Sequence, residues 1–281
     1  MQTIYLIYLF IIGLIFGSFA SVLIHRWFNK KPGILNGRSE CPNCKHRLGF
    51  MDLIPLLSYV TSLGKCRYCK NKISSVYPLL EVSMGILFLL SGIYLTDFEL
   101  IMSGNYIEII RLCFFLFISF VIVTFTFYDI LYMEIPDEIM IPGIIFIFLL
   151  LIVASVSKDF NLFGFYKDFD NVLLSIPLIN GILGSLVIFL FFLAQIMVSD
   201  GAWMGGGDLR IAVFMGLVGG FKIAVLGLML AYMIGSVFGI LILLKTKSKD
   251  TAIPFGPYLG AGLFLSLLFY DKIIFWYLNI L

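Results

Sequence analysis

Eight runs of apolar residues divide this chain, and they restrict its fold more than any other feature of the sequence. They lie at about residues 5–24, 78–95, 109–128, 139–156, 172–198, 209–219, 223–244 and 258–277. Hydrophobic residues make up 61% of the sequence and charged residues 13%, whereas a soluble domain has roughly 45–50% and 25%. This composition excludes a disordered chain, a nucleic-acid-binding protein and an ordinary cytosolic enzyme. We therefore expect an all-α polytopic membrane protein with about eight transmembrane helices.

The run at residues 209–219 is shorter than a membrane is thick. As a helix it would extend about 16 Å, roughly half of a ~30 Å hydrocarbon core. We expect a short helix that starts within the membrane and is sheltered by protein. The following run contains Gly227, Gly235 and Gly239, which permit close packing of helices. Cys113 is expected to be a small core residue of its span.

Basic residues are concentrated between the first two runs. Residues 25–77 hold ten Lys and Arg residues and two acidic ones, a formal charge of +8, while the rest of the chain carries −6. Basic loops stay in the cytoplasm, so we expect the N-terminus outside and this insert inside. Alternation of the spans then places loops 129–138, 199–208 and 245–257 in the cytoplasm. Because no basic residue precedes the first run, we expect an uncleaved anchor.

Four cysteines form two Cys-x-x-Cys pairs within the basic insert. Cys41 and Cys44 are separated from Cys66 and Cys69 by 21 residues. Two such turns supply four thiolates for a tetrahedral site, which suits zinc. A reducing cytoplasm disfavours disulfides, although a redox pair or disulfides are alternatives. Four protein ligands leave no open position, so we expect structural Zn²⁺ in a small zinc-ribbon-like cytoplasmic insert between the first and second helices.

Two aspartates lie at the ends of apolar runs, where acidic side chains are costly. Asp129 ends the third run, and Asp208 begins the sixth directly after Gly205, Gly206 and Gly207. The alternation of spans places both at the cytoplasmic side. Two carboxyls in a poorly solvated site share one proton, so one can activate water while the other protonates a leaving amide. The glycines would leave room for an extended substrate.

Simpler explanations exist for the same residues. Asp208 is placed to cap a helix N-terminus, and Asp129 could reach water at the interface. The glycine run would also serve as a hinge, and Asp137 is expected to cap the next helix. A zinc-stabilised, non-catalytic membrane scaffold for pilus or secretion assembly explains the cysteines but not the paired acids. A transporter could use the acids, but no clear inverted repeat supports it.

The order of these motifs resembles that of the bacterial type IV prepilin leader peptidases, which are also N-methyltransferases. The resemblance runs from about residue 13 to 262. It rests on Gly17-Ser18-Phe19, the two cysteine pairs, Asp129 with Ile135-Pro136-Asp137, Gly205-Gly206-Gly207-Asp208 and Ile253-Pro254-Phe255-Gly256-Pro257. Arg210 stands where a lysine is more usual, which keeps the charge.

The resemblance implies a bifunctional enzyme of the bacterial cytoplasmic membrane. The peptidase would cut the basic leader of prepilins or pseudopilins at the cytoplasmic face, with Asp129 and Asp208 as catalytic residues of GxGD form. The methyltransferase would methylate the new N-terminal residue with S-adenosylmethionine. Residues 1–96 would be the methyltransferase-associated region and residues 97–281 the peptidase domain. The candidate residues for methyl transfer are Gly64, Lys65 and Glu81, and those of the metal motif are Cys41, Cys44, Cys66 and Cys69.

Overall fold

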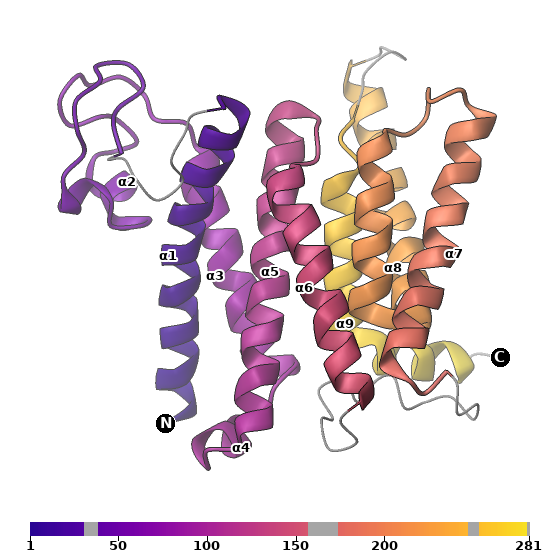
Figure 1. Cartoon of the computed structure of the whole chain (residues 1–281). Coiled ribbons are helices and arrows are strands. Elements are labelled where there is room, and N and C mark those ends of the chain that lie inside the picture. The colour runs from indigo at the N-terminus through magenta and orange to yellow at the C-terminus, as the bar shows by residue number, and fades with distance from the viewer. Residues whose placement is uncertain (31–38, 157–173, 247–252, 280–281) are drawn as a thin grey trace. The chain divides into compact units, whose positions relative to one another are not determined.

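The computed structural model describes residues 1–30, 39–156, 174–246 and 253–279, and in these ranges it consists of helices with two isolated β-bridges. Seven helices there are long and apolar enough to cross a membrane (Figure 1). They are α1 (Gln2–Phe28), α3 (Val76–Tyr94), α5 (Tyr106–Tyr132), α6 (Asp137–Val156), α7 (Pro177–Val198), α8 (Gly206–Thr246) and α9 (Gly256–Leu278). Short helices are η1 (Phe50–Asp52), α2 (Leu57–Thr61) and α4 (Phe98–Met102). The expectation of an all-α membrane protein with a four-cysteine insert after its first helix is confirmed.

The chain forms two compact units. Unit 1 comprises Met1–Asn105 and Leu112–Phe127, and it contains the four cysteines. Unit 2 comprises Tyr106–Arg111 and Tyr128–Leu281, and it contains Asp129 and Asp208. Helix α5 contributes its central part to unit 1 and its two ends to unit 2.

Small residues allow α1 and α3 to pack closely in unit 1. A Cβ at Gly13 would lie 2.6 Å from the Cα of Gly85, and a Cβ at Gly17 would lie 2.6 Å from the Cα of Glu81. Membrane helices associate where such residues let their backbones approach, because apolar side chains gain little by leaving lipid. Glu81 therefore lies on α3 at the level of Gly17.

Helix α8 reverses its direction at Gly220. Its backbone angles there are φ 64° and ψ −171°, a region that glycine alone adopts readily. The hydroxyl of Tyr232 lies 3.8 Å from the sulfur of Met204. A straight helix would separate these positions by about 42 Å. Residues 206–219 and 221–246 are therefore the two antiparallel arms of α8, and Figure 1 shows them in orange.

The sixth and seventh apolar runs thus belong to one helical element, which is why eight runs correspond to seven candidate spans. The first arm of α8 is about 20 Å long and is shorter than a ~30 Å hydrocarbon core. Its C-terminal end, at Gly220, is covered by α7, because the backbone of Gly220 lies against Gly184. The short run predicted to be sheltered by protein is such a helix.

Polar side chains of α7 hold the reversal in place. The buried Asn180 accepts a hydrogen bond from the N–H of Phe221 at 2.8 Å and donates one to the carbonyl of Leu174 at 2.9 Å. The hydroxyl of Ser185 donates to the carbonyl of Val213 at 2.9 Å. Because the bilayer core offers no water, an unpaired N–H at this break would be costly. Helix α7 therefore sets the position of the arm that carries Asp208.

The second arm of α8 packs against α9 through its glycines. A Cβ at Gly227 would lie 3.2 Å from the Cα of Leu263, whereas Gly239 faces open space.

The expectation for Cys113 was wrong, because this side chain is exposed. The next two residues of α5, Phe114 and Phe115, occupy the buried face of the helix instead.

Candidate active site and metal centre

Asp129 lies in the last turn of α5 and is 6% exposed. One of its carboxylate oxygens accepts a hydrogen bond from the N–H of Gly256 at 2.8 Å. Gly256 is the first residue of α9, so the carboxylate faces the N-terminal end of a helix. The free N–H groups and the dipole of a helix N-terminus both favour a negative charge there.

Gly256 must lack a side chain for this contact to form. A Cβ at this position would lie 2.6 Å from the carboxylate oxygen Oδ2 of Asp129. Gly256 lies within the motif Ile253-Pro254-Phe255-Gly256-Pro257, for which the resemblance implies no particular role. A Pro-x-Gly-Pro segment just before an apolar run was the available signal, and only the fold shows which carboxylate it holds.

Asp208 lies in the first turn of α8 and is 9% exposed. Its carboxylate accepts a hydrogen bond from the N–H of Gly205 at 3.1 Å, and its own N–H donates to the Gly205 carbonyl at 3.1 Å. The carboxylate thus stabilises the start of the helix, as the capping explanation requires. This contact uses one oxygen, so the cap and a chemical role are compatible.

The three glycines before Asp208 differ in their surroundings. A Cβ at Gly207 would lie 2.8 Å from the side chain of Ile135, so this position packs tightly. Gly206 has no atom within 4 Å of such a Cβ, and for Gly205 the nearest lies at 4.0 Å. The backbone of the first two glycines is therefore accessible, and the third glycine packs against the loop after α5.

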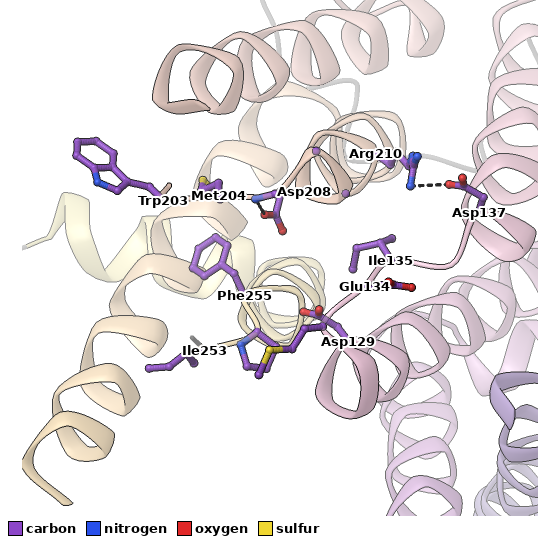
Figure 2. A pocket seen from close by; sticks show the side chains of 15 residues that line it. Asp129, Glu134, Ile135, Asp137, Trp203, Met204, Asp208, Arg210, Ile253 and Phe255 are labelled. Atoms are coloured by element: carbon purple, nitrogen blue, oxygen red, sulfur yellow. Dashed lines mark hydrogen bonds and ion pairs between the residues drawn. The ribbon is translucent and has the colours of Figure 1, made fainter. Parts of the chain in front are cut away.

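Asp129 and Asp208 line a single cavity of about 520 Å³ within unit 2. Figure 2 shows both carboxyl groups facing the same space, with Phe255 and Ile135 on either side. The residues that line the cavity come from three segments: Asp129, Met133, Glu134, Ile135 and Asp137; Trp203 to Asp208 and Arg210; and Ile253, Pro254 and Phe255. The fold thus joins two aspartates that are 79 residues apart in sequence.

A charged pair lies at the edge of this cavity. Arg210 contacts Asp137 at 2.6 Å, and both side chains are about half exposed (Figure 2). Asp137 begins α6, so its negative charge also interacts favourably with the N-terminus of that helix. The pairing leaves Glu134, Asp129 and Asp208 as the acids of the cavity that no cation contacts in the described residues.

The four cysteine sulfurs of the insert lie within 4.8 Å of one another. The sulfurs of Cys41 and Cys69 are 3.9 Å apart. Four sulfurs that bind one zinc ion at about 2.3 Å in a tetrahedron lie about 3.8 Å from each other. The donor set and its spacing therefore fit a tetrahedral metal ion.

The two cysteine pairs fold into the same turn, and we name residues 40–47 and 65–72 the first and second knuckle. In the first, Glu40 bridges Arg47, and in the second, Lys65 bridges Lys72. Lys45 and Lys70, each directly after the second cysteine of its pair, have positive φ. Each knuckle thus directs two sulfurs toward one point.

Backbone groups prepare one of these thiols for metal binding. The N–H groups of Cys44 and Asn43 point at the sulfur of Cys41 and lower its pKa to about 7, although burial opposes the shift. A thiolate is the form that binds metal. The donor set and the spacing of the four sulfurs therefore favour a metal centre at the cysteines.

The three candidates for methyl transfer lie in two parts of unit 1. Lys65 begins the second knuckle and Gly64 directly precedes it, whereas Glu81 lies on α3. The carboxylate of Glu81 is buried and accepts a hydrogen bond from the N–H of Leu56 at 2.7 Å. Among the described contacts, none joins Glu81 to Gly64 or Lys65.

Comparison with known proteins gives matches over both units. Residues 11–95 match the family described as Bacterial Peptidase A24 N-terminal domain, and residues 113–240 match the Type IV leader peptidase family. The chain is 30% identical to a prepilin leader peptidase/N-methyltransferase of Bacillus subtilis, over 96% of this chain and 97% of that protein. Proteins of the same name from Aeromonas salmonicida and Pseudomonas aeruginosa are 29% and 27% identical, over 96% of this chain and 92% of each relative. No solved structure matches the chain.

Proposed function

We propose, from the premise that this chain belongs to the type IV leader peptidase family, that it cleaves the leader of prepilins or pseudopilins and methylates the new N-terminal residue. Its family membership confirms the resemblance inferred from the motifs, and the relatives carry both activities in their name. The enzyme would act in the bacterial cytoplasmic membrane, with the N-terminus outside and both the insert and the peptidase site toward the cytoplasm.

The observation that carries the peptidase proposal is that Asp129 and Asp208 face one cavity. Two buried carboxyls in one site hold a single proton between them, because a second negative charge there is poorly solvated. The ionised carboxylate takes a proton from a water molecule, whose oxygen attacks the peptide carbonyl carbon. The protonated carboxyl gives its proton to the amide nitrogen as the carbon–nitrogen bond breaks.

The glycine run supports binding of an extended substrate. Gly205 and Gly206 have open space where other residues have a side chain. A substrate backbone could therefore approach their peptide groups closely. Gly207 packs against Ile135, so the run is held in the wall of the cavity that Asp129 and Asp208 also line.

The structural metal of the insert would be Zn²⁺, bound by Cys41, Cys44, Cys66 and Cys69. Four thiolates saturate a tetrahedral ion, so it would stabilise the fold and take no part in chemistry. S-adenosylmethionine would supply the methyl group. Residues 1–96 are the part of the chain to which we assign methyl transfer and residues 97–281 the part to which we assign cleavage.

A non-catalytic scaffold held by zinc is the second candidate. It requires the cysteine insert but gives no reason for two buried carboxyls to share a cavity. Helix capping accounts for the contact of Asp208 with Gly205. It also accounts for the contact of Asp129 with the first N–H of α9, but it does not explain why both carboxyls face one cavity.

The direct test uses Asp129→Asn and Asp208→Asn in the full-length protein. Each should lower the rate of leader cleavage by at least about 10³-fold, because a neutral amide neither accepts nor supplies the proton. Asp200→Asn is the matched control, since Asp200 is exposed in a turn and has a φ of 50° that asparagine also tolerates. The mass of a purified prepilin, before and after incubation, reports loss of the leader and gain of a methyl group separately.

Normal cleavage by either active-site variant would refute the assignment of that aspartate. Both variants should still methylate a pilin whose leader has already been removed. If the unaltered protein leaves prepilin unchanged while a known peptidase processes the same preparation, the scaffold is the correct alternative.

A further inference from the structure

Residues 49–64, which lie between the two knuckles, form an apolar and exposed segment within the most basic part of the chain. Its six exposed large apolar side chains are Phe50, Met51, Leu53, Leu57, Val60 and Leu63. Phe50 is 82% exposed and Leu63 is 85% exposed. We name this segment, which contains η1 and α2, the inter-knuckle loop. An apolar surface of this kind marks a place of contact with a protein or a membrane.

The inter-knuckle loop also presents no unpaired charge. Asp52 is its only charged residue, and the carboxylate of Asp52 contacts other residues of the insert. One oxygen lies 3.3 Å from the guanidinium of Arg67, and the other accepts hydrogen bonds from the Tyr68 hydroxyl and the Gly49 N–H at 3.1 Å each. The charge that would oppose contact with lipid is therefore neutralised.

The attachment of the loop places it at the level of a membrane helix. The N–H of Leu56 donates to the carboxylate of Glu81 on α3, at 2.7 Å. Glu81 in turn lies against Gly17 of α1. Gly17 is seven residues before Ile24, where the apolar run of α1 ends, which corresponds to about 10 Å along the helix. Figure 1 accordingly shows α2 at the level of the C-terminal half of α1.

Basic side chains surround this apolar loop on both sides in the sequence. The knuckles carry Lys45, Arg47, Lys65, Arg67, Lys70 and Lys72, and all six are exposed. The described insert residues 39–75 contain two acids, Glu40 and Asp52. Apolar side chains flanked by lysine and arginine are the pattern of segments that lie in the membrane interface and attract anionic headgroups.

We propose that the inter-knuckle loop is an interfacial membrane anchor, which inserts its apolar side chains among anionic lipids beside α1 and α3. Lipid is the favoured occupant, because the loop is attached at a depth where α1 is already apolar. The anchor would hold the cysteine insert against the bilayer surface. This role does not depend on either enzymatic activity.

The test places a single tryptophan in the loop of the full-length protein. Trp27, Trp203 and Trp276 are replaced by phenylalanine, and Leu63→Trp or Phe50→Trp is added. The matched control is Asn43→Trp, at the exposed tip of the first knuckle. Each protein is reconstituted in nanodiscs of phosphatidylcholine and phosphatidylglycerol, with or without chains brominated close to the headgroup. Zinc content of one ion per chain serves as the check of folding.

The loop tryptophans should emit at shorter wavelength than the control and should be quenched at least threefold more strongly by the brominated lipids. Replacing phosphatidylglycerol by phosphatidylcholine should reduce that quenching. Equal quenching of loop and control positions would overturn the proposal. The proposal would also be overturned if brominated lipids did not quench the loop tryptophans but an added prepilin shifted their emission to shorter wavelength. That result would indicate a substrate-binding surface.

A second measurement requires no substitution. The unaltered protein, in nanodiscs that contain a photoactivatable phosphatidylglycerol, should form lipid adducts on peptides from residues 49–64. Adducts confined to α1, α3 and the other membrane helices would contradict the anchor.

Discussion

Replacing Asn180 with leucine tests whether the reversal at Gly220 positions the arm that carries Asp208. Asn180 is buried on α7 and bonds to two backbone groups, the N–H of Phe221 and the carbonyl of Leu174. Leucine has a similar volume, so the cost of a cavity is small. What changes is the hydrogen bonding at the break in α8.

The expected cost follows from the two bonds that are lost. The N–H of Phe221 has no helical partner at the break, and leaving such a group unsatisfied costs about 1–3 kcal/mol. Leu174 is a half-buried residue before the first turn of α7, so we expect water to replace the amide at its carbonyl. We therefore expect a loss of about 2–3 kcal/mol, which lowers the unfolding midpoint by about 5–10 °C in a domain of this size.

The assay is thermal unfolding of the full-length protein in detergent micelles, followed by the fluorescence of the exposed Trp203 beside the cavity. Ser236→Ala is the control, since it removes an exposed hydroxyl that bonds to a carbonyl of its own helix. Asn180→Leu should also lower kcat for leader cleavage, because the arm that carries Asp208 moves. A midpoint equal to that of Ser236→Ala would refute the role of Asn180.

Three further outcomes follow from the same geometry. Gly216→Ala should destabilise the protein by about 1–3 kcal/mol, because its Cβ would overlap the backbone of Ser185. Gly239→Ala should be neutral or slightly stabilising, because its Cβ meets no atom within 4 Å. The unfolding midpoints of the two variants in detergent test this difference. Cys66→Ser, or a strong chelator, should release one zinc per chain, measured by mass spectrometry of the metal, and zinc affinity should fall with decreasing pH because protons compete for the thiolates. Arg210→Ala should change stability by less than about 1 kcal/mol because its pair with Asp137 is half exposed, and a larger shift in the unfolding midpoint would mean that the pair holds α6 and α8 together.

The class of the fold could be predicted from the sequence because lipid imposes its requirements on every span separately. A run such as 139–156 is apolar on all sides, and most of its backbone groups bond within its own helix, so no distant residue is needed to identify it. The cysteine pairs are equally local. Each Cys-x-x-Cys followed by lysine contains the whole turn that directs two sulfurs inward.

The contacts of the two aspartates depend on residues that local sequence patterns cannot relate. Gly256 contacts Asp129 across 127 positions of the chain, and only the packing of α9 against the end of α5 reveals that a side chain there would displace the carboxylate. The sixth and seventh runs looked like two spans because hydropathy records length and not direction. The reversal that joins them at Gly220 depends on Asn180, which accepts a hydrogen bond from the N–H of Phe221, 41 residues away in the sequence.

What the sequence by itself determined is therefore the all-α membrane class, the grouping of four cysteines in one insert and the family to which the chain belongs, because these follow from composition and from motifs over a few residues. What only the tertiary structure decided is the cavity that joins Asp129 to Asp208, the backbone groups that hold each carboxylate and the depth at which the inter-knuckle loop lies. The reason is physical. A hydrogen bond or a close backbone approach is a property of two positions at once, and its partner is specified by how helices pack.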